Sequence, residues 1–219
     1  MEKSIEVIWN EGFLREDALI APRINNLYDQ KSIHLVDRIE RMFQNNLRGI
    51  VIGAFLFLGL SSLLGMSLMG IGYFIILTVI YFINRHLAKG LKSIDKNTSS
   101  YQYIKNFERW MLEMVAINKR MARFYYPAFF ICTIVGFWVA SFRGRPPLGE
   151  IIMEKLLSNI PDMHLLFGLP LIGIFTSAVV VILLAVFAGS IYQWDFNVIY
   201  GGVMRKLEEI IDDMEELRK

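Results

Sequence analysis

Residues 49–84 read GIVIGAFLFLGLSSLLGMSLMGIGYFIILTVIYFIN, thirty-six residues without one charged side chain. A single helix of that length would extend about 54 Å, whereas the hydrocarbon core of a bilayer is only about 30 Å thick. The stretch must therefore reverse direction, and residues 65–70 (GMSLMG) supply the backbone freedom for a turn. We predict a transmembrane helical hairpin over 49–84. If its two helices are too short to cross, the hairpin is re-entrant, and both of its ends still lie on one side.

The rest of the chain separates apolar from charged residues in the same way. Hydrophobic residues make up 54% of the 219 residues and charged residues 20%, and the charges are concentrated between the apolar blocks. This segregation is typical of a polytopic membrane protein. Further apolar blocks lie at 124–142 and 165–194. We therefore predict an all-α integral membrane protein with four transmembrane helices, of which the first two form a tight hairpin, and long cytoplasmic helical extensions.

The distribution of basic residues predicts the orientation. Of the 23 Lys and Arg residues, twenty lie in 1–48, 85–123 and 195–219, and three lie in 143–164. Basic residues in short flanking segments are retained on the cytoplasmic side. We expect an inner-membrane protein with both termini cytoplasmic, and an external loop at 143–164 that contains a short amphipathic helix.

Each cytoplasmic segment has a helical pattern. In 1–48 the apolar residues Ile33, Val36, Ile39, Phe43 and Leu47 share one face, and the segment continues into the first span without a helix breaker. The basic segment 85–123 likewise continues into the third span, and we expect Pro127 near the first turn of that span, where proline is tolerated. Its clusters of Lys and Arg at the ends of the second and third spans match the anionic headgroups of a lipid bilayer.

Small residues predict close helix packing in the first and fourth spans. Gly49 and Gly53 are spaced four residues apart, a pattern that allows another helix to approach. A longer series of small residues in the fourth span has the same spacing, and we expect these faces to contact other helices or a second copy in a homo-oligomer. The series consists of Gly173, Ser177, Ala185 and Gly189.

The acidic segment 195–219 has an apolar seam of helical spacing. The part of this segment that most favours a helix follows Gly201-Gly202. Acidic residues occupy positions outside the apolar seam. Two heptads are marginal as an isolated helix, so this seam needs a neighbour, and the basic segment 85–123 is the expected one. The seam consists of Leu207, Ile210, Met214 and Leu217.

No pattern indicates a reaction or a cofactor. The three histidines, His34, His86 and His164, have no second His or Cys at metal-ligand spacing. The spans contain no Asp, Glu, Lys or Arg, which disfavours proton or ion coupling. A net charge of +2 is too small to indicate nucleic acid. We expect neither enzyme activity nor a metal site.

Three functions were compared on these patterns. The favoured one is a non-enzymatic scaffold or regulatory protein whose cytoplasmic helices bind a protein partner or mediate oligomerisation. The alternative is an oligomeric channel or a transporter accessory subunit, lined by hydroxyl groups and glycines. A lipid-modifying enzyme is the third, and it would have to use His86 with Asp95 and Glu108.

Overall fold

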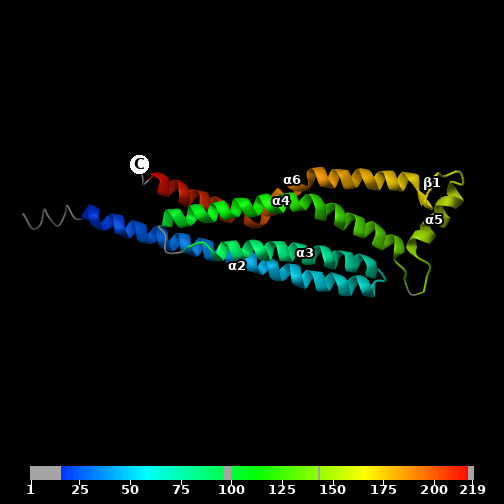
Figure 1. The fold of residues 1–219 in the computed structure, drawn as a ribbon, viewed down its shortest axis with the longest axis horizontal. Coiled ribbons are helices and arrows are strands. Elements are labelled where there is room, and N and C mark those ends of the chain that lie inside the picture. The colour runs from blue at the N-terminus through cyan, green and yellow to red at the C-terminus, as the bar shows by residue number, and fades with distance from the viewer. Residues whose placement is uncertain (1–15, 96–99, 143, 217–219) are drawn as a thin grey trace, which may run out of the picture.

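The computed structural model describes residues 16–95, 100–142 and 144–216 (Figure 1). Four of the helices in this part of the chain are long and apolar enough to cross a membrane, namely α2, α3, α4 and α6. The all-helical class with four candidate spans is therefore confirmed, and these are the helices of a multi-pass membrane protein. The helices are α2 (Glu16–Leu63), α3 (Ser67–Lys92), α4 (Ser100–Val139), α5 (Leu148–Asn159) and α6 (Leu171–Glu216).

The connection between α2 and α3 is a glycine-terminated turn. Gly65 has φ of +70°, a conformation that disfavours residues with a Cβ atom. Its N–H donates to the carbonyl of Ser62 and the N–H of Met66 donates to that of Ser61, the hydrogen-bond pair of a Schellman motif. A Cβ atom at Gly65 would also collide with the carbonyl oxygen of Ser141. The chain therefore turns within 64–66, and α2 and α3 lie side by side (Figure 1).

The long helices run through the boundaries between the predicted segments. α2 includes both the polar stretch before residue 49 and the apolar stretch after it, and α4 does the same around residue 124, as predicted. Pro127 lies in the interior of α4, so the expectation that it is tolerated as in the first turn of a helix was wrong. Proline has no N–H to donate to the carbonyl four residues earlier, so α4 lacks one backbone hydrogen bond there.

Helix α6 has other bounds than the predicted fourth span, 165–194. The helix begins at Leu171 and not at residue 165, because β1 (Leu165–Leu166) and β2 (Leu169–Pro170) form a two-stranded hairpin. Phe167 and Gly168 turn this hairpin with φ of 52° and 76°. At the other end α6 continues through Gly201-Gly202 to Glu216. Each glycine costs a helix about 1 kcal/mol, but apolar residues on both sides of the pair are buried in one core and offset that cost.

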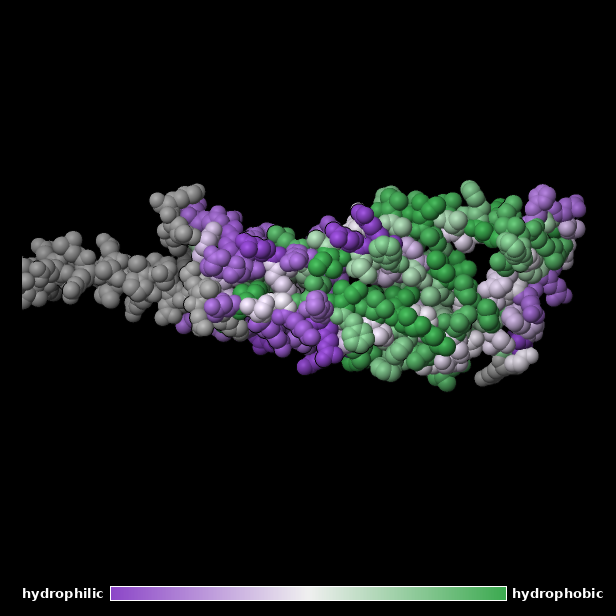
Figure 2. Space-filling model, in the orientation of Figure 1, coloured by the Kyte–Doolittle hydropathy of each residue, from purple (hydrophilic) through white to green (hydrophobic). Residues whose placement is uncertain are grey.

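The buried core lies at one end of an elongated molecule. This end holds the start of α2, the ends of α3 and α6 and the start of α4 (Figure 1), and its outer surface is hydrophilic (Figure 2). The other parts of the long helices expose large apolar side chains, as Figure 2 shows. Exposed apolar surface of this extent is typical of a lipid-facing region. The apolar half is therefore the part that a bilayer would surround.

Candidate functional site

The hydrophilic end is a four-helix bundle with a closed core. We call this part the bundle; it comprises 30–48 of α2, 85–92 of α3, 101–118 of α4 and 196–216 of α6. Ile104, Phe107 and Met111 at its centre are fully buried, because residues three and four apart share one face of α4. The core residues are Leu35, Val36, Ile39, Phe43, Leu47, Ala88, Leu91, Tyr103, Ile104, Phe107, Trp110, Met111, Met114, Phe196, Tyr200, Val203, Leu207 and Ile211.

The tail of α6 lies against α4 and α2 in this bundle. Of the predicted seam, Leu207 is completely buried, Met214 is buried and Ile210 is half-buried. Leu217 lies outside the described residues. The sequence did not single out Ile211, which is only 4% exposed. The face of α6 that enters the core is therefore formed by Val203, Leu207, Ile211 and Met214.

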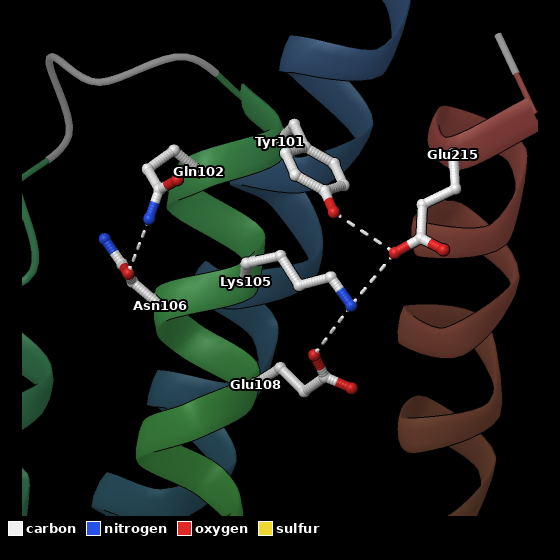
Figure 3. Close-up of polar contacts among 6 residues, drawn as sticks. All are labelled: Tyr101, Gln102, Lys105, Asn106, Glu108 and Glu215. Carbon is white, nitrogen blue, oxygen red and sulfur yellow. Dashed lines mark hydrogen bonds and ion pairs between the residues drawn. The ribbon is translucent and has the colours of Figure 1, made fainter. Parts of the chain in front are cut away.

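Polar contacts join the end of the tail to the start of α4 (Figure 3). The hydroxyl of Tyr101 donates to Glu215 Oε1 at 3.1 Å, and Lys105 Nζ lies 3.1 Å from the same oxygen. Lys105 also lies 3.4 Å from Glu108 on its own helix. These side chains are partly exposed, and exposed ion pairs contribute about 0–1 kcal/mol each. They orient the tail on α4, and the apolar core supplies most of the stabilisation.

A second polar layer lies where the bundle meets the apolar half. Asn84 of α3 and Asn118 of α4 are both buried, and each side-chain amide donates to the other. Nearby, the hydroxyl of Tyr126 donates to Asp195 Oδ2 at 3.0 Å and so joins α4 to α6. In the sequence, this polar layer is indicated by an amide or a carboxylate residue directly at the end of an apolar run. That pattern did not identify the partners, because they come from different helices.

The glycines predicted to pack against other helices lie in open space. No atom lies within 4 Å of a Cβ atom placed at Gly49, Gly53 or Gly189, and Gly173 has only the ring of Pro170 at 3.7 Å. Ser177 and Ala185 are half-buried on α6. A second series of glycines, which was not predicted to pack against other helices, makes close contacts. It consists of Gly70 against Ser61, Gly72 against Cys132, Gly136 against Met69 and Gly149 against Trp138.

Two grooves with basic walls lie at the junction between the bundle and the apolar half. One, of about 600 Å³, runs between α2 and α3 and includes Arg48, Arg85 and Lys89. The other, of about 840 Å³, runs between α4 and α6 and includes Arg120 and Arg123. Among the residues that the structure describes, no acidic one lines either groove. Both therefore have the charge that suits an anionic ligand.

A third groove, of about 490 Å³, lies on the bundle between α2 and α6 and contains charges of both signs. Leu35 and Ile210 also line it, so part of the groove is apolar. The charged and polar residues along it are Gln30, His34, Arg38, Lys206, Glu209 and Asp213. We call it the α2–α6 groove.

The described residues contain no cluster of metal ligands. Among them no three His, Cys, Asp or Glu side chains lie close enough together to hold a metal ion. Of the residues that a lipid-modifying enzyme would use, His86 is exposed and Glu108 is paired with Lys105. Comparisons of the chain with family models, curated proteins and solved structures found no match. The surfaces described above are therefore the features of the molecule that bear on its function.

Proposed function

We propose that the chain is a multi-pass inner-membrane protein whose bundle lies in the cytoplasm and binds a protein partner. In this arrangement α2 and α3 form a transmembrane hairpin, α4 and the apolar part of α6 form the other two spans, and both termini are cytoplasmic. Basic residues at the junction support this orientation, because they are retained on the cytoplasmic side. The β1–β2 hairpin and α5 then lie outside.

The observation that carries the proposal is the closed core of the bundle. A helical extension that only linked spans would need no core of its own, whereas this one buries aromatic and aliphatic side chains from four helices. The bundle is thus a small folded domain fixed to the membrane. Such a domain provides a rigid surface for recognition.

The α2–α6 groove is the surface that we assign to the partner. Ile210 in its lining suits an apolar side chain of a partner helix, and Arg38 of α2 with Lys206 and Glu209 of α6 gives the groove charges of both signs. Rim charges of both signs set the orientation of a partner more than its affinity. We therefore expect an amphipathic helix that has one apolar stripe and both acidic and basic flanks.

Site-specific photocrosslinking in native membranes tests this function. A photoreactive residue in place of Ile210 should crosslink one protein of a mass different from that of this chain. The same residue in place of Glu113, which is exposed on α4, should not. Arg38→Glu should abolish the crosslink from position 210. If both positions crosslink the same products, or neither does, the proposal is wrong; if the product has twice the mass of this chain, the bundle mediates oligomerisation instead.

The channel alternative has weaker support. The hydroxyl groups of Ser61, Thr78 and Thr176 donate to carbonyls three or four residues earlier in their own helices. Hydroxyl groups that are satisfied in this way are poor candidates for coordinating an ion. Ion flux in proteoliposomes would test this alternative directly, and we expect none above that of protein-free vesicles.

A further inference from the structure

The groove between α4 and α6 at the edge of the apolar half has the composition of a lipid-headgroup site. We call it the α4–α6 groove. Lys119, Arg120 and Arg123 of α4 line one wall, and α6 lines the other with residues from Val186 to Asn197. The two arginines are exposed and Lys119 is half-buried. Three cations lie within five residues of α4, and none of the described residues in the lining is acidic, so the groove is a site of positive potential.

The α6 wall is shaped by small residues. Gly189 and Ser190 line the groove where a larger side chain would fill it, and a Cβ atom placed at Gly189 has no neighbour within 4 Å. The glycine that sequence analysis assigned to helix packing therefore opens a space beside the cations. This space continues toward the apolar half at Val186, which is 66% exposed.

Polar groups on the same wall complete the site. Gln193 Nε2 donates to Asn197 Oδ1 at 3.0 Å, so the two amides are held together one turn apart at the polar end of the groove. Trp194 also lines the groove and exposes much of its ring, as is typical of tryptophan at a membrane interface. The groove therefore passes from amides and cations at one end to an apolar wall at the other.

We propose that the α4–α6 groove binds the phosphate of an anionic phospholipid. The cations of α4 contact the phosphodiester, the amides of α6 contact the polar headgroup, and the acyl chains leave past Val186 along the exposed apolar side chains of α6. One of these, Ile182, lies one helical turn further into the apolar half. Arginine suits this role because its planar guanidinium donates to two oxygens of one phosphate. A soluble phosphate would use the cations but not the apolar end, so the apolar end favours a lipid.

Native mass spectrometry of the full chain in mild detergent tests the site. The probes are dioleoylphosphatidylglycerol, which is anionic, and dioleoylphosphatidylcholine, which is zwitterionic. We expect one phosphatidylglycerol to bind preferentially. The variant Arg120→Gln/Arg123→Gln should weaken that binding about tenfold or more, because each basic residue at the membrane surface adds to the free energy of binding an anionic lipid. Arg109→Gln/Arg205→Gln removes the same charge from exposed positions outside the grooves and should leave binding unchanged.

A second pair of variants tests the shape of the groove at constant charge. Gly189→Leu places a large side chain where the structure has open space, and it should abolish the preference for phosphatidylglycerol without loss of folding. Gly189→Ala fills little of that space and should preserve the preference. Thermal unfolding in detergent without added lipid verifies that both variants are folded.

Three results would overturn the proposal. Equal weakening by the Arg109/Arg205 control, or by Arg85→Gln/Lys89→Gln in the groove between α2 and α3, would mean that lipid binding reflects total charge and not this groove. Unchanged binding in Gly189→Leu would place the lipid elsewhere. Displacement of the lipid by millimolar glycerol 3-phosphate or inorganic phosphate would show that the groove recognises a soluble phosphate compound.

Discussion

Asn84 and Asn118 exchange two hydrogen bonds across the interface of α3 and α4, with N···O distances of 3.3 and 3.2 Å. Each amide also donates to a carbonyl of its own helix, four residues earlier. Both side chains are buried, so neither has water as an alternative partner. Because two amides pair in this way only at one relative position, the pair fixes the register of the α2–α3 unit against the α4–α6 unit.

Replacing both members of this pair should cost less than the sum of the two single replacements. Asn118→Leu leaves the amide of Asn84 buried with one partner fewer, a change that costs about 1–3 kcal/mol. Asn84→Leu should have a similar effect, whereas the double variant should lose less than the sum of the two. Thermal unfolding in detergent measures all three. Asn159→Ala, which breaks a hydrogen bond at an exposed helix end, is the control and should be nearly neutral. Additive losses would show that the two amides are not coupled.

Glycine substitutions should separate packed positions from open ones. A Cβ atom at Gly136 of α4 would collide with Met69 of α3, so Gly136→Ala should destabilise the protein by about 1–3 kcal/mol. Gly53→Ala meets no neighbour within 4 Å and should stabilise α2 by up to about 1 kcal/mol through helix propensity. Unfolding in detergent compares the two. If Gly53→Ala proves the more harmful, another copy of the chain packs on α2.

The sequence was sufficient to predict the helices and most of their buried faces. In 28–48 the predicted stripe of Val36, Ile39, Phe43 and Leu47 is buried, because burial in a helix recurs every three to four residues. Ile33 belongs to the same predicted stripe but is 45% exposed. Ser32 and Leu35 on either side of it are buried, so Ile33 lies at the edge of the buried face, and periodicity alone does not place that edge.

Two kinds of information were not accessible from the sequence. The contacts of the glycines depend on which helix crosses each of them, so Gly53 and Gly136 cannot be distinguished by spacing. Which residues of the tail face the core depends on how the preceding part of α6 is oriented. Because α6 is continuous through Gly201-Gly202, the buried series Phe196, Tyr200, Val203 and Leu207 continues to Ile211. The seam was predicted for the tail as an independent helix, and Ile210 was therefore included in it.

The proposed orientation predicts opposite labelling of two exposed serines. In a Cys132→Ala background, Ser158→Cys on α5 should react with a membrane-impermeant maleimide in intact cells. Ser93→Cys, at the end of α3, should react only after permeabilisation, because the proposal places it in the cytoplasm. The reverse pattern would invert the topology. Labelling of both positions in intact cells would mean that the four helices do not cross as proposed.

The tail of α6 provides the last prediction, and it concerns the surface that we assign to the partner. Leu207 and Ile211 are buried in the core, so Leu207→Asp or Ile211→Asp should release the tail from α4 and α2. A large apolar side chain contributes about 1.5–3 kcal/mol when it is fully buried, and a carboxylate in its place adds a desolvation penalty. Ile210→Asp should have a smaller effect, because Ile210 is only half-buried at the groove.

Amide hydrogen exchange across 203–214 measures this release. Protection should be lost in Leu207→Asp and retained in Glu209→Gln, which changes an exposed side chain. Lys105→Gln removes the ion pair with Glu215 and should cost no more than about 1 kcal/mol, because the pair is partly exposed. Fast exchange of 203–214 in the unmodified protein would mean that the tail is not docked. In that case the α2–α6 groove would form only when a partner binds. Position 210 should then give no crosslink in membranes that lack the partner.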